Sequence, residues 1–174
     1  VHRELVKRND LAEGLIYLQL SRGNPGDRDF AFPSEDVTPT IVLFTQTANL
    51  LNSPKIATGM KVISVDDQRW ARRDIKTTQL LFPSMAKMMA KAAGVDDAWL
   101  VEDGHVTEGS SNNAYIVKDG KIITRHLGSE ILHGITRAAV LAYAEAAQMQ
   151  IEERPFTIEE AKTADEAFIT SAST

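Results

Sequence analysis

Two Asp-Gly pairs in the second half of the chain constrain its fold more than any other feature. Asp103-Gly104 and Asp119-Gly120 divide the stretch DDAWLVEDGHVTEGSSNNAYIVKDGKIITRH into three runs rich in β-branched and aromatic residues. Asp-Gly between such runs favours a tight turn between antiparallel strands, because both central residues of that turn need a positive φ. The stretch therefore predicts three short strands joined by two hairpins.

Segments with helical spacing of apolar residues flank these strands. LLFPSMAKMMAKAAG ends at Gly94, and GITRAAVLAYAEAAQMQ begins behind Gly134. TIEEAKTADE opens at Thr157, with Glu160 in the position of a capping box. Further strands are predicted in LIYLQL, TPTIVLFTQT and EAFITS. Interspersed strands and helices without an internal repeat predict an α+β (mixed α/β) protein.

The domain organisation follows from a break in both periods at TANLLNSP. We expect residues 1–48 to end one small domain, residues 49–54 to be an interdomain linker, and residues 55–174 to form a larger domain. In that larger domain, Met85, Met88 and Met89 are expected to fill the hydrophobic core, since methionine adapts to irregular gaps.

Composition narrows the classes of function. The formal net charge is -5, the pI is about 5.4, and the basic residues are scattered, so no nucleic-acid partner is expected. No apolar run approaches the roughly 18 residues of a membrane span, and VHRELVKRND lacks the apolar core of a signal peptide. The chain has no cysteine, which excludes disulfides and thiolate metal sites. We expect a cytoplasmic protein that acts on small molecules, with no metal site and no membrane partner.

Lys76, in the stretch DQRWARRDIKTTQ, is the first candidate functional residue. Ile75 and the pair Leu80-Leu81 give it apolar neighbours in sequence, and a lysine removed from water can act as a nucleophile or base. The alternative is a surface lysine that pairs with Asp74. Its own neighbourhood leaves both interpretations open.

Two further stretches carry more polar groups than packing requires. In VTEGSSNNAY, Glu108 precedes a glycine and four small polar residues that can orient a carboxylate or bind an anion; a plain hairpin loop is the alternative. In LHGITR, a helix begins at Ile135 and Thr136, where free amides, the helix dipole and the Thr136 hydroxyl can bind a phosphate. Ser171 is a candidate for the same anion, although a glycine before a helix is also common in purely structural roles.

A lysine nucleophile, a carboxylate and a phosphate site are together the parts that a pyridoxal phosphate enzyme needs. The strings RRDIKTTQLL, VTEGSSNNAY, HGITR, PF and FITS occur in this order along the chain. They resemble the fold-type IV pyridoxal phosphate enzymes (aminotransferase class IV), and within them the D-amino acid transaminases most closely. The resemblance covers essentially the whole chain.

The resemblance implies a role for particular residues. Lys76 is implied to form the Schiff base with the cofactor and to shuttle the proton during the reaction. Glu108 is implied to keep the pyridine nitrogen protonated. The other implied cofactor contacts are Leu132 against the ring, Ile135 and Thr136 at the phosphate, and Ser171 with Ala172 as a second phosphate-binding pair, in which Ala172 replaces a hydroxyl residue.

The loop GNPGDRDFAFP resembles the substrate loop of D-amino acid transaminases, which usually carries an arginine and, two residues later, a histidine. Arg28 keeps the arginine, which can bind the α-carboxylate of a substrate with two hydrogen bonds. Phe30 stands where the histidine is expected. The alternative for Arg28 is an ion pair with Asp27 or Asp29.

The implied function is pyridoxal phosphate-dependent transamination of D-amino acids with a 2-oxo acid such as 2-oxoglutarate or pyruvate, by a ping-pong mechanism. Alternatives with the same fold are a branched-chain L-amino acid aminotransferase, an aminodeoxychorismate lyase and an (R)-amine transaminase. Outside the fold, a non-catalytic phosphate-ligand binding module and an aldolase-like enzyme without a cofactor remain.

The resemblance also implies the architecture: a small α/β domain, a larger pseudo-barrel domain that binds the cofactor, and a homodimer. Family members extend beyond both ends of this chain, which lacks an initiating methionine and stops at AFITSAST. We therefore expect a fragment whose larger domain is truncated at its C-terminus and which is inactive by itself. Whether Arg28 serves its own subunit or the neighbouring one does not follow from the sequence.

Overall fold

The computed structural model describes residues 1–173, which divide into two compact units with a boundary between Ala57 and Thr58. The helices are α1 (His2–Arg8), α2 (Pro54–Thr58), α3 (Leu81–Ala92), α4 (Ile135–Ala146) and α5 (Ile158–Lys162). The strands are β1 (Gly14–Ser21), β2 (Thr40–Thr47), β3 (Val62–Asp66), β4 (Asp97–Glu102), β5 (His105–Gly109), β6 (Asn113–Lys118), β7 (Lys121–Thr124), β8 (Gln150–Glu153) and β9 (Glu166–Thr170). Within the described residues, no helix is long and apolar enough to cross a membrane.

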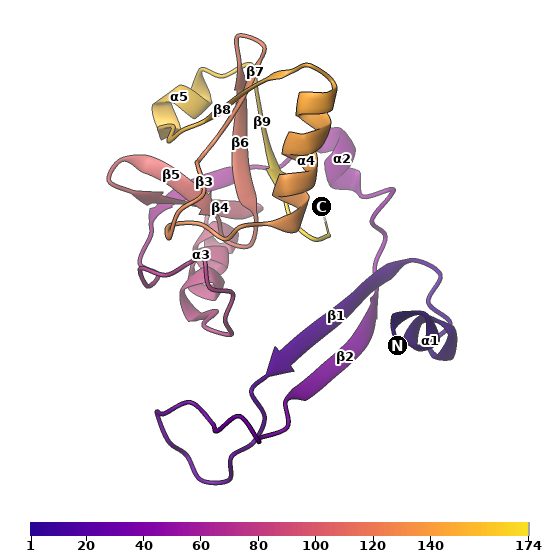
Figure 1. Ribbon diagram of the computed structural model, residues 1–174. Helices are drawn as coiled ribbons and strands as arrows, with labels where there is room; N and C mark the ends of the chain where they lie inside the picture. Colours follow the sequence, from indigo (N-terminus) through magenta and orange to yellow (C-terminus); the bar gives the residue numbers. More distant parts are fainter. Residues whose placement is uncertain (174) are drawn as a thin grey trace. The chain divides into compact units, whose positions relative to one another are not determined.

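The first unit is built on one antiparallel strand pair. β1 and β2 pair over their whole lengths, from Gly14 opposite Thr47 to Ser21 opposite Thr40, and residues 22–39 form the loop between them (Figure 1). The Glu13 carboxylate accepts hydrogen bonds from the backbone amides of Leu50 and Leu51, which ties the start of the predicted linker to this unit. The domain boundaries given above stay a prediction.

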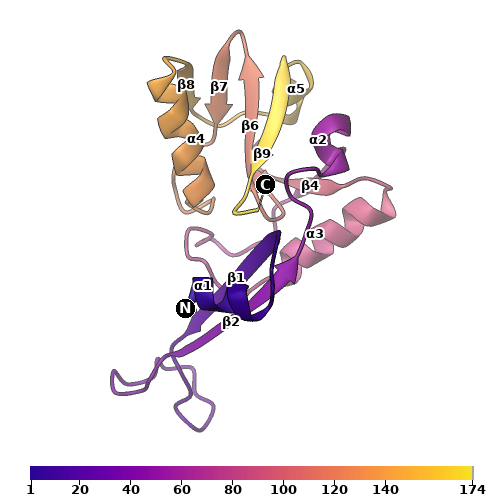
Figure 2. The same cartoon turned by 90° about the vertical axis from the view of Figure 1, so that its right-hand side faces the viewer.

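The second unit contains two sheets. β3 pairs in parallel with β4, which pairs in antiparallel fashion with β5; the other sheet has the order β8-β7-β6-β9. α3 packs on the first sheet, and α4 and α5 cover opposite faces of the second (Figures 1 and 2). The alternation along β6 explains this, because Tyr115 points towards α4 whereas Ala114 and Ile116 point to the other face.

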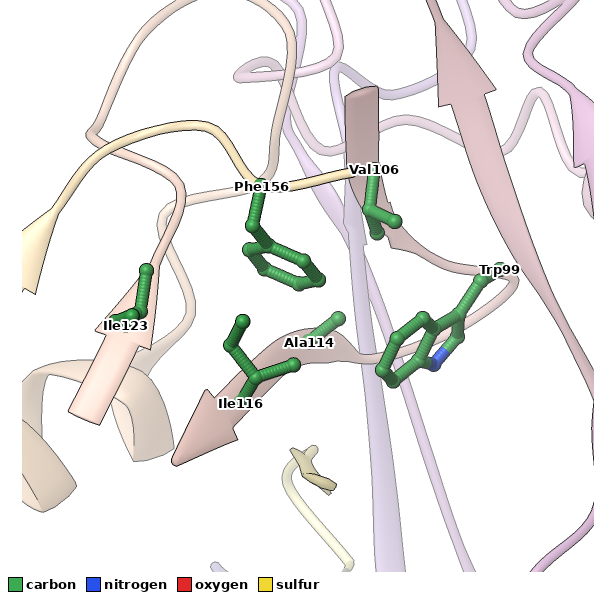
Figure 3. Close-up of a cluster of buried hydrophobic side chains, with 6 residues drawn as sticks. All are labelled: Trp99, Val106, Ala114, Ile116, Ile123 and Phe156. Carbon is green, nitrogen blue, oxygen red and sulfur yellow. The ribbon is translucent and has the colours of Figure 1, made fainter. Parts of the chain in front are cut away.

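A cluster of buried side chains fills the space between the two sheets (Figure 3). The Trp99 ring meets the Phe156 ring edge to face, with 5.8 Å between the ring centres. The cluster comprises Trp99, Val106, Ala114, Ile116, Ile123 and Phe156. Because it draws on β4 to β7 and on the segment before α5, it holds the end of β5, and with it Glu108, at a fixed place.

Both predicted hairpin turns are confirmed. Asp103 and Gly104 have φ values of 50° and 76°, and Asp119 and Gly120 have φ values of 51° and 73°. The stretch forms four strands rather than the predicted three, because residues 110–112 leave the sheet after β5 and the chain enters the second sheet at β6. The helix α2 begins at Pro54, the last residue of the predicted linker.

The prediction that the methionines of α3 fill the core is wrong. Met85, Met88 and Met89 are 45%, 61% and 43% exposed, whereas Ala86 and Ala90 are fully buried against β4. Small residues let the helix backbone approach the sheet closely, and the larger side chains then lie on the opposite face. Helical spacing alone therefore identified an apolar stripe on the wrong side of the helix.

At α5, the predicted cap is confirmed in part. The Thr157 hydroxyl accepts a hydrogen bond from the Glu160 amide at 3.0 Å, as a capping box requires. The Glu160 side chain does not return to the cap; instead it pairs with Arg154 at 2.5 Å.

Candidate active site

Glu108 is a deeply buried carboxylate in one of the segments that the sequence marked as functional. It lies next to the end of β5 and is 4% exposed. One oxygen, Oε1, accepts a hydrogen bond from Arg69 at 2.5 Å. The other, Oε2, accepts from the Asn113 side-chain amide at 3.0 Å and from the Leu132 backbone amide at 3.1 Å. Three segments far apart in sequence thus converge on one side chain.

Burial and the neighbouring cation act in opposite directions on Glu108. Burial raises the pKa of Glu108 and outweighs the effect of the Arg69 guanidinium, which lowers it. Asp67, on the other side of Arg69, is also desolvated, but the hydrogen bonds from Arg69 and Thr107 hold its pKa below the usual range. Arg69 thus lies between two carboxylates, and its Nε and Nη2 atoms bond to Asp67 at 2.9 and 2.7 Å.

The segment that carries Lys76 is held in place by Arg73, three residues before that lysine in the sequence. The Arg73 guanidinium binds both oxygens of Glu102 at 2.7 and 2.8 Å, and its backbone amide donates to the Ser129 carbonyl at 2.8 Å. Lys76 itself is exposed, and so are Ile75 and Leu80, so these apolar neighbours do not bury it. Asp74, the alternative partner for Lys76, instead pairs with Arg72 at 2.8 Å.

The start of α4 and the turn after β9 meet at one end of the second sheet (Figure 1). The Thr136 hydroxyl donates a hydrogen bond to the Ser171 carbonyl at 2.7 Å, which joins the two stretches predicted to bind a phosphate. That hydroxyl is therefore engaged as a donor, contrary to the expectation that it donates to an anion. The N-cap residue Gly134 supplies no side-chain oxygen, which leaves the first amides of this twelve-residue helix to other acceptors.

The polar run after Glu108 serves two different carboxylates. Ser110 and Asn112 donate to the buried Asp97, at 2.5 and 2.7 Å, and Lys87 pairs with the same carboxylate at 3.0 Å. Only Asn113 turns towards Glu108. The run therefore orients carboxylates, as one of its two predicted interpretations held, but most of it holds the loop to β4.

The structure brings some of the predicted site residues together. Hydrogen bonds connect Glu108 to Leu132, and Thr136 to Ser171, while Ile135 is the exposed first residue of α4 and Ala172 is exposed beside Ser171. Arg28 lies in the first unit, where its guanidinium stacks on the Phe30 ring at 4.6 Å instead of pairing with a neighbouring aspartate. Among residues 1–173, no group of three or more His, Asp or Glu side chains is placed to hold a metal ion.

Sequence reasoning missed Arg69 and did not single out Asn113 within the polar run from Ser110 to Asn113, although these two side chains hold the Glu108 carboxylate. Arg69 is one of three arginines within five residues, and nothing in that run distinguishes the buried ones from the exposed Arg72. Asn113 follows another asparagine with a different partner. A search for a cation to balance a buried glutamate could have suggested Arg69 as a candidate, but it could not have shown that Arg69 pairs with Glu108.

Replacing Arg69 with methionine should destabilise the protein by about 3 kcal/mol near neutral pH, because it leaves Glu108 buried without its cation and leaves Asp67 with only the more distant Arg73, at 3.7 Å. The pKa of Glu108 is already raised, and loss of Arg69 raises it further. A glutamate with a raised pKa in the folded protein lowers the free energy of unfolding only above the ordinary pKa of a glutamate. The loss of stability caused by Arg69→Met should therefore shrink as the pH falls from 8 to 5. Denaturant titrations at several pH values measure this. Arg72→Met, at the exposed pair with Asp74, is the matched control and should have little effect.

Comparison with known proteins gives consistent results. The family model for amino-transferase class IV matches residues 2–174. The D-alanine aminotransferase of Staphylococcus aureus (strain N315) is 37% identical over 171 residues, covering 98% of this chain and 60% of that protein. The D-alanine aminotransferase of Bacillus licheniformis is 38% identical over 170 residues, covering 97% and 59%. The chain thus spans about 60% of the length of the curated relatives it matches.

Solved structures show the same fold. A Legionella pneumophila protein provisionally assigned as a 4-amino-4-deoxychorismate lyase superposes with a TM-score of 0.82 at 26% identity, over 97% of this chain and 62% of that chain. The branched-chain amino acid aminotransferase of Thermobaculum terrenum, in its PLP-containing holo form, superposes with a TM-score of 0.73 at 25% identity, over 98% and 56%. The predicted α+β class and fold-type IV architecture are confirmed. The chain belongs to the class IV aminotransferases, a family that uses pyridoxal phosphate.

Proposed function

We propose that the protein containing this chain transfers the amino group of a D-amino acid to a 2-oxo acid, using pyridoxal phosphate held between Glu108 and the start of α4. The observation that carries the proposal is the direct link between these two groups: the Leu132 amide, two residues before the helix cap, donates to the Glu108 carboxylate. A buried carboxylate and a helix N-terminus are thereby held in one rigid region. The D-alanine aminotransferases among the relatives favour this reaction.

The hydrogen bonds of Glu108 fit a pyridine nitrogen. Its Oε1 atom accepts from Arg69, and a carboxylate oxygen has room for a further donor, such as the N–H of a protonated pyridine ring. A cationic ring placed there also removes the cost of the buried negative charge. Glu108 would thus hold a proton at the ring nitrogen, and the bound cofactor supplies a conjugated ring that withdraws electrons from the substrate α-carbon.

The start of α4 fits a phosphate. The backbone amides of Ile135 and Thr136 lie in the first turn, where a helix leaves its amides unpaired and its dipole favours an anion. The turn from Ser171 to Ala172 is held beside them by the Thr136 hydroxyl. In this arrangement Thr136 contributes its amide and positions the turn, while its oxygen keeps a lone pair rather than a proton to offer.

Lys76 would provide the amine. Its side chain is exposed within a segment that Arg73 fixes on two sides, to Glu102 and to the Ser129 carbonyl. The Nζ atom is thus attached to a rigid base and has freedom at its tip, which suits a group that binds covalently and then moves a proton to and from the substrate α-carbon.

The substrate class is tested by a panel of D- and L-amino acids with 2-oxoglutarate or pyruvate in the complete protein. We expect turnover of D-amino acids at least tenfold above that of the matching L-amino acids. Arg28, whose guanidinium stacks on the Phe30 ring in the first unit, stays the predicted contact for the α-carboxylate. Preference for L-valine or L-leucine would contradict the proposal.

Two structural neighbours each favour a further candidate: one is a branched-chain aminotransferase, and the other is provisionally assigned as a 4-amino-4-deoxychorismate lyase. The need for a 2-oxo acid distinguishes a transaminase from a lyase, because a transaminase requires this amino-group acceptor to complete its cycle and a lyase does not. Product formed from 4-amino-4-deoxychorismate without a 2-oxo acid would favour the lyase.

A further inference from the structure

Asn113, the first residue of β6, contacts both ends of the proposed cofactor site. Its side chain is buried, and the Nδ2 atom donates to Glu108 Oε2 at 3.0 Å and to the Leu132 carbonyl at 2.9 Å. Both hydrogens of the amide are therefore engaged. One of them reaches the carboxylate, and the other reaches the segment that leads into α4.

Leu132 closes this arrangement into a ring of hydrogen bonds. Its amide donates to the same Glu108 oxygen at 3.1 Å, and its carbonyl accepts from the Gly134 amide at 2.9 Å as well as from Asn113. Glu108, Asn113 and Leu132 are thus each hydrogen-bonded to the other two. Such a closed network resists displacement of any one member more than separate hydrogen bonds would.

Gly134 shows how closely Asn113 approaches the helix start. The glycine has φ -64° and ψ 135°, which any residue can adopt, so its backbone gives no reason for a glycine. A Cβ atom at this position would lie 2.2 Å from the Asn113 Oδ1 atom. The absence of a side chain is therefore explained by the asparagine, whose carbonyl packs against the cap of α4.

We propose that Asn113 is a positioning residue that fixes the separation between the Glu108 carboxylate and the phosphate-binding start of α4. The inference rests on the proposed function, since it concerns a ligand that bridges these two groups. A rigid ligand binds tightly at both ends only when their separation matches its length. Asn113 touches neither end of the ligand in this account and acts through Glu108, Leu132 and Gly134.

Binding of pyridoxamine 5′-phosphate to the complete protein tests the inference, because this ligand carries an amine and forms no covalent bond with a lysine. Asn113→Ala should weaken its binding at least tenfold, as expected for loss of a hydrogen bond to a charged group. Inorganic phosphate, which occupies one end only, should bind within twofold of its original affinity. Asn112→Ala is the matched control: it removes a neighbouring buried amide that bonds to Asp97, so it should reduce thermal stability while changing pyridoxamine 5′-phosphate affinity less than threefold.

A double-mutant cycle supplies the second test. Gly134→Ala should weaken pyridoxamine 5′-phosphate binding in the original protein, because the new methyl group displaces Asn113. The same change should have almost no effect in the Asn113→Ala background, where nothing remains to be displaced. If Asn113→Ala does not fold, Asn113→Ser takes its place, since it removes the amide oxygen but keeps a donor.

The possible results distinguish failure of the proposed function from failure of the positioning role of Asn113. No binding of pyridoxamine 5′-phosphate to the unsubstituted protein would overturn both the function and the inference. Equal losses for Asn113→Ala and Asn112→Ala, a parallel loss of inorganic phosphate binding, or additive effects in the cycle would each overturn the positioning role and leave the proposed function standing.

Discussion

Replacing Lys76 with alanine should lower kcat/KM for transamination by about 10³-fold or more, because it removes both the amine that binds the cofactor and the group that moves the proton. The side chain is exposed and its segment is anchored by Arg73, so the variant should fold with an unchanged thermal midpoint. Steady-state kinetics of the complete protein, together with a melting curve, measure both expectations.

Lys91→Ala provides the control for this loss. Lys91 lies in the last turn of α3 and is also exposed, but no part of the proposed site comes from that turn. Its replacement should leave the rate unchanged. Turnover in Lys76→Ala within tenfold of the original would rule out the assigned role of Lys76.

Glu108→Gln should retain the cofactor yet lower kcat by about 10²-fold or more. The amide has nearly the shape of the carboxylate but no charge, so it cannot hold a proton at the pyridine nitrogen. It also presents an N–H group to Arg69, Asn113 or the Leu132 amide, all of which are donors. The absorbance of the bound cofactor and the rate of a single turnover measure the two effects separately.

Asp97→Asn is the matched control for Glu108→Gln, since Asp97 is a second buried carboxylate on the adjacent strand, with its own lysine and two side-chain donors. It should lower stability without a comparable loss of kcat. Similar rate losses in both variants would indicate that damage to the sheet, and not the charge at Glu108, limits the reaction.

Much of the fold could be predicted because its signals are local. The two Asp-Gly turns need positive φ at both residues, and the Thr157 cap bonds to an amide three residues away, so the sequence around each contains its physical cause. The exit of the chain from one sheet after Gly109 could not be predicted in this way. It depends on Asp97, which lies on β4 and accepts hydrogen bonds from the side chains of Ser110 and Asn112.

The same distinction between local and distant signals holds for the residues of the candidate site. Glu108, Ile135 and Thr136 occur in motifs that a family resemblance can identify, and their catalytic and cofactor-binding roles remain predictions. Arg69 could not be found, and Asn113 could not be distinguished from its polar neighbours, because their roles come from hydrogen bonds across 39 and 5 residues of sequence, which no periodicity records. The prediction for the methionines of α3 failed for a related reason. Which face of the helix is buried depends on the small residues, Ala86 and Ala90, that let the sheet approach closely.

The most direct test of the account is to identify the lysine that binds the cofactor. The complete protein would be incubated with pyridoxal phosphate and reduced with borohydride, which makes the lysine–cofactor bond permanent, and the modified peptide would be located by mass spectrometry. Of the nine lysines in this chain, Lys76 should be labelled stoichiometrically. Labelling of another lysine, or scattered labelling at low yield, would contradict it.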